Sequence, residues 1–119
     1  MGQNVRSEIF RENLLEGKVV VLSGAGTGLG REATLEMIRL GAIVIGCGRR
    51  AEPLEETAGL AEELPGSFEF ETLDIRDEEA IDSFFDGVVE RHGRIDLLVN
   101  NAGGQFLSPA EMINPKGFR

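Results

Sequence analysis

The sequence predicts an α/β fold built on a doubly wound parallel sheet, and three observations lead to this fold class. Apolar runs without polar alternation occupy residues 19–22, 42–47 and 96–99, as is typical of parallel strands buried on both faces. Segments with helical periodicity separate these runs, so strands and helices alternate along the chain. A glycine-rich segment, residues 23–30, joins the first run directly to the first helical segment. This order builds a parallel sheet with helices on both faces.

The elements that follow the glycine-rich segment have recognisable ends. Residues 29–40 form the first predicted helix, and Gly41 ends it, as glycine commonly does just past a helix. Residues 42–47 are rich in Ile and Val and form the second strand. Pro53 suits the first turn of a second helix, which extends to about Leu64.

The third strand and the third helix differ from the earlier ones in pattern. Residues 67–73 alternate, with Glu69 and Glu71 on one face, which fits an edge strand with one wet face. Asp77 is the expected N-cap of the next helix, and Gly93 is its expected end. The apolar stripe of this helix comprises Ile81, Phe84, Phe85, Val88 and Val89.

The two ends of the chain carry weaker patterns. We expect a short leading helix over residues 5–15, and a loop from Asn100 onward, where glycine and proline recur. The fourth strand, residues 96–99, is then an exposed apolar edge, of a kind that tends to aggregate. The sequence therefore predicts that residues 1–119 form a single incomplete domain from the N-terminal part of a longer protein.

Composition disfavours several classes of partner. The formal net charge of −9 disfavours nucleic acid and anionic membranes, which usually bind a basic face. No apolar run reaches the roughly 20 residues of a membrane span, and residues 1–16 lack the apolar core of a signal peptide. A single cysteine, Cys47, fits a reducing compartment, and no group of residues has metal-ligand spacing. We expect a cytoplasmic protein without a metal.

The glycine-rich segment predicts a phosphate site. Glycines lack a Cβ, so backbone N–H groups of this segment can approach a phosphate closely at the positive end of the next helix. A Walker P-loop requires Gly-Lys-Ser/Thr after the last glycine, and this chain has Gly30-Arg31-Glu32 instead. The remaining interpretations are a methyltransferase-type loop and a dinucleotide-binding loop.

The end of the second strand distinguishes these interpretations. A methyltransferase or an NAD-binding protein is expected to carry an acid there for the ribose hydroxyls, whereas a basic residue suits the 2′-phosphate of NADP. This chain has Arg49 and Arg50 and no acid at that point. Guanidinium groups are good planar partners for phosphate oxygens, so the pair favours NADP(H). The alternative is that both arginines are solvated loop charges.

Three motifs resemble the short-chain dehydrogenase/reductase family. Residues 23–30 resemble its TGxxxGxG loop, with Ser23 in place of the leading threonine, and residues 100–103 resemble its NNAG motif. Asp74 follows the third strand, where the family contacts the adenine ring. The resemblance covers the chain from about Leu15. It implies a Rossmann-type fold, with strand order 3-2-1-4 in the part present, and a nicotinamide dinucleotide as cofactor.

The resemblance implies a role for each site residue. Backbone N–H groups around Thr27 to Leu29 bind the pyrophosphate, and the Thr27 hydroxyl is an extra donor. Asp74 accepts a hydrogen bond from the adenine amino group, unless it is a capping or turn aspartate. Asn100 ties neighbouring strands together. The full set of expected cofactor residues is Gly24, Gly26, Thr27, Gly28, Leu29, Gly30, Arg49, Arg50, Asp74, Ile75, Asn101, Ala102 and Gly103.

A finer resemblance concerns the substrate. Residues 100–111 and 114–118 look like the branch of trans-2-enoyl-CoA and 2,4-dienoyl-CoA reductases, which use NADPH. Citronellol/citronellal dehydrogenases look similar there and around residues 49–54. The resemblance implies a homo-oligomeric oxidoreductase that acts on an acyl-CoA or another small molecule. The alternative from another class is a dinucleotide-binding module without catalysis.

The composition sets a limit on this function. The family uses a tyrosine as general acid, with a lysine four residues later that lowers its pKa. This chain has no tyrosine, and its two lysines, Lys18 and Lys116, do not follow such a position. We therefore expect no catalytic residue among these 119 residues, which would hold the cofactor for groups located elsewhere.

Overall fold

The computed structural model of the protein describes residues 11, 13–100 and 107–109. Residues 13–17 form a turn, so the described end of the predicted leading helix is not helical, and most of that prediction lies outside the described residues. No helix in the described ranges is long and apolar enough to span a bilayer.

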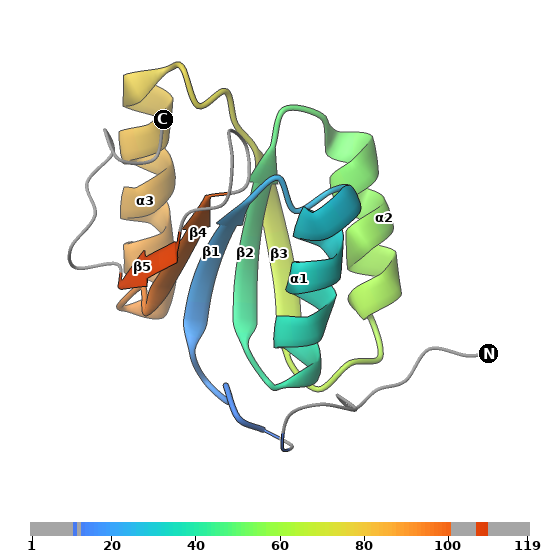
Figure 1. The fold of residues 1–119 in the computed structure, drawn as a ribbon. Helices are drawn as coiled ribbons and strands as arrows, with labels where there is room; N and C mark the ends of the chain where they lie inside the picture. The colour runs from blue at the N-terminus through green and yellow to red at the C-terminus, as the bar shows by residue number, and fades with distance from the viewer. Residues whose placement is uncertain (1–10, 12, 101–106, 110–119) are drawn as a thin grey trace.

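Four parallel strands form the centre of the sheet (Figure 1). These strands are β1 (Val19–Ser23), β2 (Ile43–Gly48), β3 (Ser67–Thr72) and β4 (Leu97–Asn100). Their spatial order, β3-β2-β1-β4, confirms the predicted order 3-2-1-4 and the Rossmann-like fold. In the register of the sheet, Val21 of β1 lies between Ile45 of β2 and Leu98 of β4.

The prediction that β4 is an exposed edge was wrong. A short strand, β5 (Leu107–Pro109), pairs with β4 in antiparallel orientation, and Leu98 lies opposite Ser108. The chain therefore reverses direction after β4, and residues 107–109 are a strand rather than loop. Proline is tolerated in β5 because this strand lies at the edge of the sheet.

Helices cover both faces of the sheet (Figure 1). Helices α1 (Gly28–Arg39) and α2 (Ala51–Ala61) lie on one face, and α3 (Glu78–His92) lies on the other. Successive residues of β1 serve the two faces, since Leu22 packs in the cluster under α1 and α2 while Val21 packs with Phe84 of α3. This division explains why β1 reads as a continuous apolar run.

The predicted ends of α1 and α3 agree with the structure. The Asp77 side chain accepts a hydrogen bond from the backbone N–H of Ala80 at 3.2 Å and so caps α3. Gly93, with φ of 81°, ends α3. Gly41, with φ of 97°, follows Leu40, the C-cap residue of α1. Helix α2 ends at Ala61, earlier than predicted. β3 is an edge strand, as its alternating pattern indicated.

Candidate cofactor-binding site

The glycine-rich loop connects β1, an interior strand of the sheet, to the N-terminus of α1. Thr27 is the N-cap residue of α1 in extended conformation, and its side chain makes no capping hydrogen bond. Gly28 follows with φ of 56°, a backbone conformation that glycine adopts without strain. The N–H groups in the first turn of a helix have no carbonyl partner within the helix. The loop therefore presents backbone donors, together with the Thr27 hydroxyl, at the positive end of α1.

A cleft of about 220 Å³ opens where the carboxyl ends of β1, β2 and β3 meet. Six residues expected at the cofactor site line it: Gly24, Gly26, Thr27, Arg49, Arg50 and Ile75. Pro53, Leu54 and Leu73 supply apolar walls. Of the remaining expected residues, Gly28, Leu29 and Gly30 lie in the first turn of α1, directly after the lining residue Thr27. Segments far apart in the sequence thus meet at one end of the sheet.

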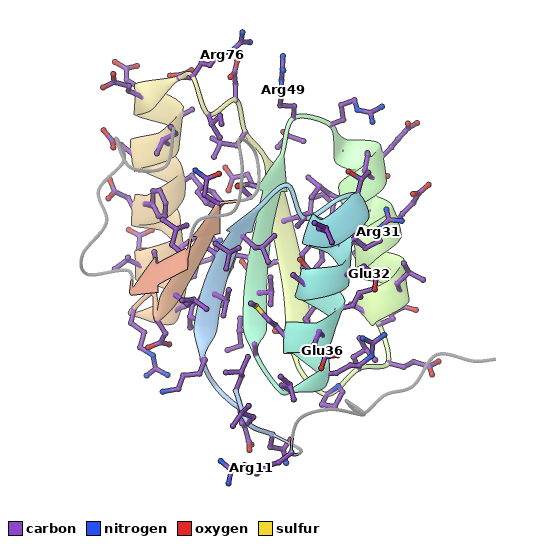
Figure 2. The ribbon with its side chains drawn as sticks, in the orientation of Figure 1. Arg11, Arg31, Glu32, Glu36, Arg49 and Arg76 are labelled. Atoms are coloured by element: carbon purple, nitrogen blue, oxygen red, sulfur yellow. The ribbon has the colours of Figure 1, made fainter. Side chains whose placement is uncertain are left out.

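Arg49 and Arg50 stand on the rim of this cleft. Both side chains are exposed, and none of the ion pairs in the described part of the chain includes either of them. Figure 2 shows Arg49 projecting from the same end of the sheet as Arg76. Two guanidinium groups therefore stand beside the loop that presents the backbone donors.

Asp74 lies beside the cleft and makes an ion pair that the sequence analysis did not anticipate. Nε of Arg76 donates to Oδ1 at 3.1 Å, and Nη2 donates to Oδ2 at 3.1 Å. The backbone N–H of Arg76 also donates to Oδ1 at 3.0 Å, as the alternative of a turn aspartate implies. These hydrogen bonds, with a smaller contribution from Arg49, lower the pKa of Asp74 to about 2. The carboxylate is therefore ionised and oriented, and its remaining lone pairs can still accept.

Asn100 ends β4 opposite Ser23, where the glycine-rich loop begins. The Ser23 hydroxyl donates to Oδ1 of Asn100 at 2.9 Å, and both residues are buried. This bond joins the carboxyl ends of β1 and β4, which confirms the expectation that Asn100 ties neighbouring strands together. Asn101, Ala102 and Gly103, which were also expected at the cofactor site, lie outside the described residues.

Comparison with known proteins agrees with this geometry. The short chain dehydrogenase family matches residues 18–119 of the chain. The chain belongs to the short chain dehydrogenase family. This membership confirms the resemblance drawn from the three motifs, and it makes the chain a relative of oxidoreductases that bind a nicotinamide dinucleotide.

Individual relatives lie in the two branches that the sequence suggested. A probable 2,4-dienoyl-CoA reductase of Bacillus subtilis (strain 168) is 33% identical over 105 residues, which are 88% of this chain and 41% of the relative. A citronellol catabolism dehydrogenase of Pseudomonas aeruginosa PAO1 is 43% identical, with a TM-score of 0.77 over 92% of this chain and 45% of the other. The chain thus spans about two fifths of the length of these relatives.

One of the similar solved structures contains NAD⁺. The structure of a xylitol dehydrogenase with bound NAD⁺ is 30% identical to this chain, with a TM-score of 0.71 over 75% of this chain and 34% of the other. Membership in the short chain dehydrogenase family therefore identifies a nicotinamide dinucleotide as the kind of ligand. The choice between NAD and NADP depends on the residues around the cleft.

The residues of this family member fit such a ligand. The first turn of α1 presents backbone N–H groups toward a pyrophosphate, and the cleft has apolar walls for an adenine ring. Cys47 also lines the cleft, but burial raises the pKa of its thiol to about 12, with a further contribution from Glu71. Cys47 is therefore a neutral, buried residue of β2 and not a nucleophile.

Two polar residues beside the loop were missed by the sequence analysis. Thr57, on the buried side of α2, donates a hydrogen bond to the Ala25 carbonyl in the loop at 3.0 Å. Arg31 of α1 donates to the Thr57 hydroxyl at 2.9 Å. The signal for Thr57 was its helical spacing three residues after Leu54 and four before Ala61, both buried.

Proposed function

We propose that this chain is the cofactor-binding part of an NADPH-dependent reductase that acts on an enoyl-CoA-type substrate. The observation that carries the cofactor choice is the position of Arg49 and Arg50 on the rim of the cleft, with no acid at the end of β2. A 2′-phosphate carries negative charge that a guanidinium group can meet with paired hydrogen bonds. An acidic residue at this position would instead favour the free ribose hydroxyl of NAD.

Each part of the cleft has a proposed share in binding. The backbone N–H groups of Gly28 and Leu29, with the Thr27 hydroxyl, hold the pyrophosphate at the start of α1. Arg49 and Arg50 hold the 2′-phosphate. The Ile75 backbone and the Asp74 carboxylate border the adenine, while Asn101, Ala102 and Gly103 continue along its ribose.

The chemistry follows from the kind of ligand. When bound, the nicotinamide of the cofactor supplies a hydride to the substrate. The residues of this chain bind and orient the cofactor, and the group that handles the proton is proposed to lie outside these 119 residues, because they contain no tyrosine.

The substrate class is proposed from the names of relatives. The Bacillus subtilis relative is named as a probable 2,4-dienoyl-CoA reductase, which supports an enoyl-CoA-type substrate. The alternative is a citronellol/citronellal-type alcohol dehydrogenase, favoured by the 43% identity to the Pseudomonas aeruginosa protein. A module that binds the dinucleotide without catalysis is the third candidate. We further propose a homo-oligomer located in the cytoplasm, where the single Cys47 would stay reduced.

Charge reversal at Arg49 tests the cofactor assignment. The dissociation constants of NADPH and NADH are measured by calorimetry for the full-length protein and for the Arg49→Asp variant. We expect the variant to bind NADPH at least tenfold more weakly, with NADH affinity maintained, because a charge-assisted phosphate contact becomes a repulsion. Arg91→Asp, which changes an exposed arginine paired with Glu69 away from the cleft, is the matched control.

A substrate panel separates the three candidate functions. NADPH oxidation is followed with a 2-enoyl-CoA, a 2,4-dienoyl-CoA and citronellal, and citronellol is tested with NADP⁺. Turnover of the acyl-CoA substrates supports the proposal, while turnover of citronellol or citronellal alone assigns the alternative. Tight NADPH binding by the full-length protein without turnover of any of the four substrates would favour the module.

A further inference from the structure

A buried hydroxyl joins the glycine-rich loop to helix α2. The Thr57 side chain has no exposed surface, and its Oγ1 donates to the Ala25 carbonyl at 3.0 Å. The same oxygen lies 3.2 Å from the Pro53 carbonyl and accepts a hydrogen bond from Nε of Arg31 at 2.9 Å. One side chain of α2 is therefore bonded both to the loop and to α1.

Arg31 extends this connection to the first turn of α2. Its Nη2 donates to the Pro53 carbonyl at 3.0 Å and to Oε1 of Glu56 at 3.1 Å. The Arg31 side chain is 23% exposed, so most of its surface is enclosed between the two helices. Figure 2 shows Arg31 at the side of α1 that faces α2. We call the groups that make these hydrogen bonds the α1–α2 bridge: Arg31, Pro53, Glu56, Thr57 and the Ala25 carbonyl.

The loop and α2 are also in close steric contact next to this bridge. A Cβ atom added to Gly26 would lie 2.7 Å from Cβ of Pro53, closer than side chains approach one another. Gly26 and Pro53 both line the cleft. The backbone of the loop therefore rests directly on the first turn of α2, and the bridge fixes this contact through hydrogen bonds.

The position of the bridge relates two parts of the proposed cofactor site. The loop on one side of the bridge presents the backbone donors proposed for the pyrophosphate. Helix α2 on its other side has Arg50 as its N-cap residue, and Arg49 precedes it. A dinucleotide with a 2′-phosphate must reach both parts at once, so its affinity depends on the spacing between them.

We propose that Arg31 and Thr57 are positioning residues of the cofactor site, which hold the glycine-rich loop at the spacing from Arg49 and Arg50 that a dinucleotide requires. This inference rests on the proposed function. Neither residue lines the cleft, so both act through the loop and α2 and not by direct contact with the ligand. A site held in its bound geometry before the ligand arrives binds more tightly, because less ordering is required on binding.

Loss of the bridge should affect ligands that span both parts of the site more than ligands that contact one part. NADPH reaches the loop and the arginines, whereas adenosine 2′-monophosphate carries the 2′-phosphate without a pyrophosphate. Loss of the bridge should lower the affinity for NADPH by about tenfold, because the pyrophosphate and 2′-phosphate contacts would no longer be held at the right spacing. The affinity for adenosine 2′-monophosphate should change less than about twofold, since the arginine pair itself remains in place.

The experiment measures dissociation constants of NADPH, NADH and adenosine 2′-monophosphate by calorimetry in the full-length protein. The variants are Thr57→Val, which removes the hydroxyl at similar volume, and Arg31→Met, which removes the guanidinium. Thr57→Ser keeps the hydroxyl, so it should bind NADPH as the parent protein does, in contrast to Thr57→Val. Thr34→Val alters another buried threonine, and Arg91→Met removes another Arg–Glu pair, so both serve as matched controls.

We expect both bridge variants to lose NADPH affinity, the double variant to lose less than the sum, and the controls to bind like the parent protein. Unchanged NADPH affinity in folded Arg31→Met protein would overturn the inference. An equal loss of affinity for NADPH and for adenosine 2′-monophosphate would also overturn it. The same holds if Thr57→Ser binds NADPH as weakly as Thr57→Val does. If Thr57→Val does not fold, Arg31→Met decides.

The proposed function can fail separately in the same titrations. A parent protein that binds NADH at least as tightly as NADPH would refute the proposed cofactor. The positioning role is then decided by NADH, since its pyrophosphate and adenosine ribose also span the loop and the end of β2. Bridge variants should bind NADH about tenfold more weakly, while the control variants bind it unchanged.

Discussion

Two buried threonines offer a matched test of how hydroxyl groups act in this fold. Thr34 of α1 and Thr57 of α2 are both fully buried. The Thr57 hydroxyl bonds to the Ala25 carbonyl and to Arg31, whereas Oγ1 of Thr34 has no hydrogen-bond partner among the described residues. Substitution by valine replaces the hydroxyl with a methyl group of similar size at each position.

The structure predicts opposite outcomes for the two substitutions. Thr57→Val leaves the buried Ala25 carbonyl and Nε of Arg31 without that partner. A buried polar group without a hydrogen-bond partner lowers the stability by about 1–3 kcal/mol. We therefore expect the free energy of unfolding to fall by about 2 kcal/mol. Thr34→Val removes a buried hydroxyl that has no hydrogen-bond partner in the described part of the chain, so we expect the free energy of unfolding to stay unchanged or rise by about 1 kcal/mol.

Urea denaturation followed by circular dichroism measures this difference. The slope of the free energy with urea concentration should be the same for the parent protein and both variants, so that midpoints can be compared directly. Equal destabilisation by the two substitutions would refute the reasoning, because the hydrogen bonds of Thr57 would then contribute nothing. Greater destabilisation at Thr34 would refute it more strongly.

Three further predictions concern the cleft and its surroundings. Gly26→Ala should weaken every dinucleotide more than about tenfold in calorimetry, because its Cβ would lie 2.7 Å from Cβ of Pro53; parental affinity would contradict this close approach. The Asp74 pKa, held near 2 by Arg76 against an ordinary value of 3.8, makes the folded protein more stable above pH 3.8, and this contribution is lost as the pH falls toward 2. In Arg76→Met the pKa of Asp74, followed by NMR titration, should return toward 3.8, and an unchanged value would exclude Arg76 as the cause. Asp77→Ala should lower the free energy of unfolding by about 1 kcal/mol through loss of the N-cap of α3, and a denaturation midpoint equal to that of the parent would exclude this role.

Local patterns were sufficient to predict most of the fold. The apolar run of β1 is continuous because neighbouring residues are buried on opposite faces, Val21 under α3 and Leu22 under α1 and α2. Asp77 and Gly93 marked the ends of α3 because capping depends on single residue types near the helix end.

The features that sequence analysis missed depend on contacts across the chain. β5 was taken for loop because three residues with a proline carry no strand periodicity, and their pairing with β4 requires a reversal of the chain that no motif specifies. Thr57 lies between the buried residues Leu54 and Ala61 of α2, and its hydroxyl has no evident partner until α2 is placed against Ala25. Arg76 pairs with Asp74 at a spacing of two residues, which loops allow but do not require.

The sequence was sufficient to predict which segments form the site, but not which of their residues contact one another. Glycines before a helix and polar residues after buried strands predicted that these segments meet at one edge of the sheet. The cleft unites Gly24, Arg49 and Ile75 from three different loops, as that reasoning required. The bridge that sets the spacing between the loops joins α1 to α2 through Thr57, which does not line the cleft and belongs to no motif of the phosphate site.

The ratio of the NADH and NADPH dissociation constants in the full-length protein tests the central claim most directly. Arg49 and Arg50 on the rim of the cleft predict that NADPH binds at least tenfold more tightly than NADH. Equal affinities, or a preference for NADH, would contradict the assignment of the arginine pair to the 2′-phosphate.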